Sequence, residues 1–135
     1  WVWRDCKPMN IVVTRTGLLQ PLDFEGACRI GCPDAMLWGT PGFIPPEWRT
    51  VEKQTGRADD LYALGSMLYL LVTGRVPSST DPISTEKLRR NISGELSTLI
   101  LRLLGRDPRR RPSAKKTLAH LNQIRETLNP AAAGD

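Results

Sequence analysis

The sequence predicts a mainly α-helical protein with one small β-hairpin, and three features lead to this prediction. Residues 60–72 are apolar nearly all round, which is typical of a buried helix. Apolar residues recur at helical spacing between residues 96 and 104, and again between residues 118 and 128. Two short apolar runs within residues 11–22 flank a turn that contains Gly17, which indicates a hairpin.

The composition is that of an ordinary globular protein, and it limits the classes of function. With 135 residues, 40% of them hydrophobic and 24% charged, the chain can form one domain with a real core. No apolar run reaches the roughly 18 residues that a membrane span needs, and no signal-peptide pattern opens the chain. The chain begins with Trp1 instead of Met, so we expect it to be a piece of a longer protein.

The three cysteines, Cys6, Cys28 and Cys32, are too few and too odd in number for a disulfide framework. We therefore expect a reducing, cytoplasmic location, while a membrane anchor elsewhere in a longer parent stays open. Cys28 and Cys32 are spaced C-x-x-x-C, and no His or Cys nearby completes a metal site. Free thiols are therefore a simpler interpretation than a redox or metal role.

The opening loop, residues 3–10, concentrates polar side chains immediately before the first strand of the hairpin. Asp5, Lys7 and Asn10 crowd onto this short segment. The second strand then ends at Asp23, which is 18 residues after Asp5. Because one strand runs out and the other runs back, we expect Asp23 to return near Asp5 and Asn10, so that three side chains able to handle a metal or a proton face one volume.

The middle of the chain alternates loops and helices. Residues 27–38 show no clear periodicity and are predicted to be a loop. The buried helix should begin at Asp60 as its N-cap and stop at Gly74. Residues 78–93 are polar, and a short helix is expected near residues 86–90.

Two amphipathic helices should complete the chain. The first runs from Glu95 to Leu104 and stops at Gly105. Its apolar stripe consists of Leu96, Leu99, Ile100, Leu103 and Leu104. The last helix should have Ser113 as its N-cap and end near Leu128. Its expected buried face consists of Leu118, Leu121, Ile124 and Leu128.

The opening loop contains a motif so short that it could arise by chance, but other motifs follow it along the chain. The opening loop reads W-R-D-C-K-P-M-N, close to the pattern H-R-D-L-x-x-x-N, from which Trp3 and Cys6 depart. Residues 23–26 read D-F-E-G, where a D-F-G triplet accompanies that pattern. Glu25 replaces the glycine of the triplet and restricts the backbone there.

The second half of the chain contains three more motifs in a fixed order. Residues 39–47 read G-T-P-G-F-I-P-P-E, residues 60–65 read D-L-Y-A-L-G, and residues 107–112 read D-P-R-R-R-P. With the two earlier motifs, they make the chain similar to the eukaryotic-type (Hanks-type) serine/threonine protein kinases. The resemblance begins at the catalytic loop of that family and covers the C-terminal part of its large lobe.

This resemblance implies a partial protein-kinase-like large (C-terminal) lobe over residues 3–128, with residues 129–135 as a disordered tail. The small lobe would be absent, because no G-x-G-x-x-G loop and no V-A-I-K-like strand occur in the chain. We expect the source to be bacterial. Without the small lobe, we also expect these residues alone to be inactive.

The resemblance also assigns roles to individual residues. It makes Asp5 and Lys7 catalytic: Asp5 orients or deprotonates the substrate hydroxyl, and Lys7 steadies the transferred phosphoryl group. The cofactors would be ATP, bound with the help of Lys7, Asn10 and Asp23, and Mg²⁺, held by Asn10 and Asp23. The phenylalanine of the D-F-G triplet would pack into the core. The structural residues would be Arg4, Thr40, Glu47, Asp60 and Arg111.

Three of these assignments carry specific expectations. Asp60 would clamp the backbone of the opening loop in addition to capping its helix. Arg111 would form a bidentate, partly buried pair with Glu47. Thr40, together with the lysine of the opening loop, would favour serine or threonine substrates over tyrosine.

The segment between Phe24 and Gly39 contains no Ser, Thr or Tyr. Phosphorylation of this loop, which would ordinarily order it through an arginine such as Arg4, therefore has no acceptor. Asp34 or Glu25 could supply a permanent negative charge. We expect the loop to be ordered without phosphorylation.

Two other classes of function remain open. A pseudokinase or protein-binding module is favoured by Trp3, by Glu25 and by the missing lobe. A nucleic-acid-binding domain is suggested by the net charge of +5, much of it at residues 106–111, but no aromatic platform or reading helix accompanies this run. The expected partners are a protein substrate, ATP and the small lobe of a parent chain, without nucleic acid or a membrane segment.

Overall fold

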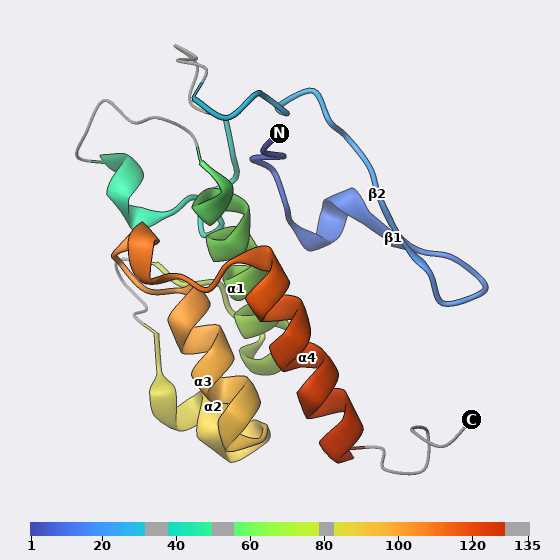
Figure 1. Cartoon of the computed structure of the whole chain (residues 1–135), viewed down its shortest axis with the longest axis vertical. Coiled ribbons are helices and arrows are strands. Elements are labelled where there is room, and N and C mark those ends of the chain that lie inside the picture. Colours follow the sequence, from blue (N-terminus) through green and yellow to red (C-terminus); the bar gives the residue numbers. More distant parts are fainter. Residues whose placement is uncertain (32–37, 50–55, 79–82, 129–135) are drawn as a thin grey trace.

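The computed structural model describes residues 1–31, 38–49, 56–78 and 83–128, and within them it shows a helical body and a thin hairpin that extends away from it (Figure 1). The helices are α1 (Arg57–Thr73), α2 (Thr85–Asn91), α3 (Gly94–Leu103) and α4 (Ala114–Leu128). The strands are β1 (Ile11–Val13) and β2 (Leu19–Pro21). The predicted mainly helical fold with one small hairpin is confirmed.

Helix α1 forms the centre of the body and is buried along most of its length. Tyr62, Ser66 and Tyr69 are each at most 6% exposed, and α1 packs against both α2 and α3. The Tyr69 hydroxyl accepts a hydrogen bond from the Ser84 backbone N–H at 3.0 Å, which fixes the start of α2. The prediction of a buried central helix is therefore confirmed.

The start of α1 differs from the sequence prediction. The helix begins at Arg57, and Gly56 occupies its N-cap position. The Asp59 carboxylate accepts a hydrogen bond from the Gly56 N–H at 2.9 Å and so closes the first turn. The prediction that Asp60 is the N-cap is wrong, because three residues before it extend the helix. The C-terminus agrees with the prediction: Gly74, at φ 72°, donates its N–H to the carbonyl of Leu70.

Helix α3 crosses α1 closely and carries the predicted apolar stripe. Four of its five residues are at most 3% exposed, and the fifth, Leu96, is half-buried. The crossing is tight at Gly65, where an added Cβ would lie 2.7 Å from the Cβ of Leu103. A glycine at this position therefore lets the two helix backbones approach each other.

Helix α4 begins as predicted but presents a different face to the body. Ser113 caps it, because its hydroxyl accepts a hydrogen bond from the Lys116 N–H. Thr117 and Ile124 are buried, whereas Leu118 and Leu128 are 60% and 65% exposed. The predicted buried face of three leucines and one isoleucine is therefore wrong for Leu118 and Leu128. The helix packs mainly against α3, and Ile124 also joins a core cluster with Leu61 of α1, so that only a narrow stripe of α4 is covered.

The hairpin pairs β1 with β2 in antiparallel register, with Val12 opposite Gln20. Its turn contains Gly17 at φ 81°, and the Thr14 N–H donates to the Leu18 carbonyl at 2.8 Å. The predicted hairpin is confirmed. Its apolar side chains are not covered within the described residues: Val13 and Leu19 are 66% and 67% exposed.

Two further predictions concern the whole chain. None of the helices in the described ranges is long and apolar enough to cross a bilayer. Cys6 and Cys28 are buried free thiols, and Cys28 pairs with Val2 through backbone hydrogen bonds of 2.9 and 3.0 Å. Cys32 and residues 129–135 lie outside the described residues.

Replacing Gly65 by Ala should destabilise the protein by about 1–2 kcal/mol. Alanine gains up to about 1 kcal/mol of helix propensity, but the new methyl group meets the backbone-anchored Leu103 Cβ, and such overpacking costs about 1–3 kcal/mol. Urea unfolding measures the difference. Gly94→Ala is the matched control, because an added Cβ there meets open space. Equal stability of Gly65→Ala and the wild type would contradict the tight crossing.

Candidate active site

The opening loop is fixed by a carboxylate from the first turn of α1. Asp60 accepts the backbone N–H of Trp3 through Oδ2 and that of Arg4 through Oδ1, both at 2.8 Å. Burial raises the pKa of Asp60 above its ordinary value, and the two hydrogen bonds only partly offset this effect. Arg4 adopts φ 69°, a left-handed conformation that a non-glycine residue seldom takes. The expected contact between Asp60 and the loop backbone is present.

The loop brings Asp5 into a cluster that we call the carboxylate network, made of Asp5, Lys7, Asn10 and Thr40. Asp5 Oδ1 accepts the Thr40 hydroxyl at 2.9 Å. Asp5 Oδ2 lies 2.7 Å from Lys7 Nζ and accepts Asn10 Nδ2 at 2.9 Å. Lys7 Nζ also donates to Thr40 Oγ1 at 2.8 Å. Thr40 thus contacts both Asp5 and Lys7, although it follows them in the sequence by 35 and 33 positions.

The environment of Asp5 favours its charged form. Partial burial raises the pKa of Asp5, but the hydrogen bonds from Lys7, Thr40 and Asn10 and the charge of Lys7 outweigh it, so that the pKa lies below its ordinary value. The side chains of Asp5 and Lys7 keep 16% and 19% of their surface exposed. The carboxylate network therefore contains an ionised Asp5 paired with the positively charged Lys7, and both side chains are accessible to solvent and to a ligand.

The hairpin brings the backbone at Asp23 back to the opening loop. The Leu22 N–H donates to the Asn10 carbonyl at 2.8 Å, and the Asp23 carbonyl accepts the Trp3 indole N–H at 2.7 Å. The Asp23 side chain is exposed, and among the described residues no hydrogen bond joins it to Asp5 or Asn10. The structure thus brings the two segments together, and the Asp23 carboxylate, whose Oδ1 accepts the Glu25 N–H at 3.3 Å, stays exposed to solvent.

Asn10 and Asp23 carry oxygen atoms of the kind that a magnesium ion prefers as ligands. Asn10 Nδ2 donates to Asp5, which leaves the Asn10 Oδ1 oxygen for a cation. Asp23 adds an exposed carboxylate. The described residues contain no group of three or more His, Cys, Asp or Glu that could enclose a metal ion. Mg²⁺ commonly takes one or two protein oxygens together with waters and substrate phosphates, so two ligands suffice.

Trp3 and Phe24 lie against each other beside Asp23. Their ring centroids are 5.4 Å apart, and Phe24 is 56% exposed. The expectation that Phe24 packs into the core is therefore wrong, because the ring stays more than half exposed and contacts Trp3 at a tilted angle. The sequence marked Trp3 only as a departure from a motif. Its indole in fact connects the opening loop to residues 23–24.

Arg4 extends its side chain away from the carboxylate network. Its Nε donates to the carbonyl of Gly26, and its guanidinium carbon lies 5.9 Å from the centroid of the Trp38 ring. Glu25 is exposed, and Asp34 lies outside the described residues. Trp38 was missed by the sequence analysis, which treated residues 27–38 as a featureless loop.

The predicted pair between Glu47 and Arg111 forms and is bidentate. Arg111 Nη1 and Nη2 donate to the two Glu47 carboxylate oxygens at 2.8 and 2.7 Å. Arg111 also donates to the carbonyls of Gly105 and Ala58 at 3.0 Å, and it lies over the Tyr62 ring at 4.9 Å. The Arg111 side chain is fully buried. We call residues 39–47 the Thr40 segment. The pair holds the end of this segment against the helical body.

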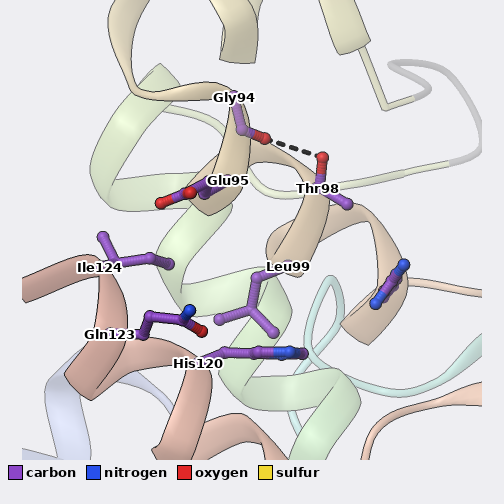
Figure 2. Close-up of a pocket in the computed structure, with 8 residues that line it drawn as sticks. Gly94, Glu95, Thr98, Leu99, His120, Gln123 and Ile124 are labelled. Carbon is purple, nitrogen blue, oxygen red and sulfur yellow. Dashed lines mark hydrogen bonds between the residues drawn. The ribbon is translucent and has the colours of Figure 1, made fainter. Parts of the chain in front are cut away.

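A separate pocket of about 310 Å³ lies between α3 and α4 (Figure 2). Leu99 and Ile124 supply its apolar surface, and polar residues such as Glu95 and His120 surround them. None of the site residues that the sequence predicts lines this pocket. The carboxylate network is therefore the candidate active site.

Comparison with known proteins identifies the family. The sequence model of the protein kinase domain matches residues 1–121. Because this match covers most of the chain, the chain belongs to the protein kinase family.

Individual relatives agree with this assignment. Sperm motility kinase Z of Mus musculus is 35% identical over 99% of this chain, and serine/threonine-protein kinase PksC of Streptomyces coelicolor is 31% identical over 84% of it. The probable serine/threonine-protein kinase CPE1738 of Clostridium perfringens is 30% identical over 95%. This chain spans 30%, 24% and 21% of these relatives, respectively. They include animal and bacterial proteins, so the bacterial source stays a prediction.

Replacing Arg111 by Lys should lower the free energy of unfolding by about 2–3 kcal/mol. Lysine keeps the charge but cannot reproduce the bidentate pair and the two carbonyl hydrogen bonds, so buried acceptors lose their partners. Arg109→Lys and Arg110→Lys are the controls, because these side chains are 88% and 87% exposed; each should change stability by less than about 0.5 kcal/mol. Chemical denaturation of the three variants measures the effects, and equal losses would count against the pair.

Proposed function

We propose that this chain is the catalytic-loop part of a serine/threonine protein kinase, which transfers a phosphoryl group from ATP to a protein hydroxyl. The observation that carries this proposal is the ionised Asp5 carboxylate held between Lys7, Thr40 and Asn10. The relatives that are named serine/threonine kinases support the same substrate class.

In this proposal Asp5 is the residue that meets the substrate hydroxyl. Its depressed pKa keeps it unprotonated at neutral pH, so it accepts a hydrogen bond from the hydroxyl and orients the oxygen for attack. Lys7 Nζ lies 2.7 Å from the same carboxylate and places a positive charge beside the transferred phosphoryl group. Phosphoryl transfer needs little covalent help and much positioning of charge, which suits these residue types.

Asn10 and Asp23 hold magnesium in this proposal. Asn10 is fixed by its two hydrogen bonds to Asp5, so its oxygen has a set direction. Asp23 is exposed at the end of β2. When bound, magnesium neutralises charge on the phosphates of ATP. Lys7 adds to the nucleotide contacts through the phosphoryl group.

Exposed apolar side chains near the hairpin support the proposal that another part of a longer kinase covers this surface. Met9 is 87% exposed, Leu22 41% and Phe24 56%, and all three lie beside the site in the chain. An exposed apolar patch marks an interaction site where such side chains are contiguous. We propose that the small lobe of a parent kinase and the ATP base cover it. The buried free thiols Cys6 and Cys28 are consistent with a reducing cytoplasm.

A pseudokinase or protein-binding module is the second candidate function. Trp3 and Glu25 depart from the catalytic motifs, and Phe24 is exposed beside Trp3. A parent protein that binds its partner but transfers no phosphate would favour this candidate. A nucleic-acid-binding domain would instead show binding to DNA that weakens steeply with salt.

Replacing Asp5 by Asn in the intact parent should lower kcat about 10²–10⁴-fold, because the neutral amide cannot accept the proton of the substrate hydroxyl. Phosphate transfer from labelled ATP measures the effect. Asp107→Asn is the matched control: it makes the same chemical change on the turn at Pro108–Arg110 and should leave kcat unchanged. Full activity of Asp5→Asn would contradict the catalytic role of Asp5.

These 135 residues alone should transfer phosphate poorly or not at all with ATP and magnesium, because the surface around Met9 and Phe24 is uncovered. The measurement compares the isolated chain with the intact parent under the same conditions. Robust turnover by the isolated chain would show that no covering lobe is needed.

A further inference from the structure

Trp38 packs on the opening loop at the point where the Thr40 segment begins. Its ring faces the Arg4 guanidinium, whose central carbon is 5.9 Å from the ring centroid. The ring also lies against Gly26, where an added Cβ would be 3.2 Å from Trp38 Cε3. The indole thus contacts two separate parts of the chain, which the hydrogen bond from Arg4 Nε to the Gly26 carbonyl joins.

Arg4 is held at both ends, so it offers the ring a fixed surface. Its N–H donates to Asp60 at 2.8 Å, and its Nε donates to Gly26. The residue is 8% exposed. A guanidinium that is buried and oriented in this way attracts the face of an indole, and the attraction strengthens as water is excluded.

The position of Trp38 bears directly on the carboxylate network. The next residue, Gly39, has φ 131°, and a Cβ there would lie 3.4 Å from the Arg4 carbonyl oxygen. Thr40 follows, and its hydroxyl contacts Asp5 and Lys7 at 2.9 and 2.8 Å. Contacts of Trp38 and Gly39 with Arg4 therefore set where the Thr40 hydroxyl lies.

We propose that Trp38 is a positioning residue, which holds Thr40 against Asp5 and Lys7 and orders this segment without a phosphate group. A phosphate orders such a loop by attracting an arginine. Here residues 25–38 contain no Ser, Thr or Tyr, and an aromatic ring attracts Arg4 permanently. The catalytic consequence rests on the proposed kinase function, whereas the ordering of the segment does not.

The test compares four variants of the intact parent. Trp38→Ala removes the ring and Trp38→Phe keeps an aromatic face. Gly26→Ala places a methyl group 3.2 Å from Trp38 Cε3, so that the ring must shift to make room for it. The control is Trp1→Ala, at a tryptophan that is 78% exposed. Amide hydrogen exchange is measured for residues 39–47, where the Phe43 N–H donates to the Thr40 carbonyl at 3.0 Å, with α3 as the reference.

We expect exchange of residues 39–47 to rise about tenfold in Trp38→Ala and Gly26→Ala, with α3 unchanged. Trp38→Phe should restore most of the protection, and Trp1→Ala should match the wild type. In phosphate-transfer assays, kcat should fall about tenfold in the first two variants, while KM for ATP changes less than about twofold. Phosphatase treatment of the wild type should leave its activity unchanged.

Unchanged exchange in Trp38→Ala would overturn the proposal. Equal acceleration in α3 would also overturn it, since that result reports a loss of global stability. Activity lost on phosphatase treatment would refute ordering without phosphate. If the parent transfers no phosphate but exchange responds as expected, the positioning role stands and the kinase function fails. If phosphate transfer is present but exchange does not respond, the function stands and the positioning role fails.

Discussion

The partly buried Asp60 carboxylate makes the hydrogen bonds on which the rest of the site depends. It comes from the first turn of the central helix and binds two consecutive backbone N–H groups of the opening loop. Burying a carboxylate is costly unless its lone pairs are satisfied, and the raised pKa of Asp60 reflects that cost. The two hydrogen bonds make the left-handed conformation of Arg4 tolerable. With Arg4 fixed, Asp5 must point toward Lys7, Asn10 and Thr40.

The opening loop contacts two carboxylates that have different roles: Asp60, which comes from α1, and Asp5, which belongs to the loop itself. Asp60 is partly buried and faces backbone donors, and its pKa is raised because desolvation dominates. Asp5 keeps some exposure and meets a lysine, a threonine and an asparagine, so its pKa is lowered. The first arrangement holds a backbone in place, whereas the second keeps a negative charge ready for a ligand. The Cys6 thiol lies close to both carboxylates. Burial, together with the negative charges of Asp60 and Asp5, raises the pKa of this thiol to about 11, so it stays protonated.

The sequence was most informative where a motif names both partners of a contact. The clamp from Asp60 and the pair between Glu47 and Arg111 were predictable, because a resemblance spanning the chain fixes which distant residues meet. Periodicity predicted α3 well, since α1, α2 and α4 all pack against it and together cover a wide stripe. It failed for α4, where Leu118 is exposed, because periodicity cannot show that only one edge of a helix is covered. Trp38 was missed because a loop has no period, and a ring-to-guanidinium contact leaves no pattern in one sequence.

The contact between Glu47 and Arg111 also bears on how the protein is made. Its two residues are 64 positions apart, and the Arg111 side chain is fully buried when they meet. At about 5–20 residues per second, a ribosome needs about 3–13 s to add those residues. During that interval the Thr40 segment lacks its anchor on the helical body, whereas the opening loop gains its support once Asp60, 13 residues after Glu47, has been added. The order of synthesis therefore supplies the anchor of the opening loop before that of the Thr40 segment.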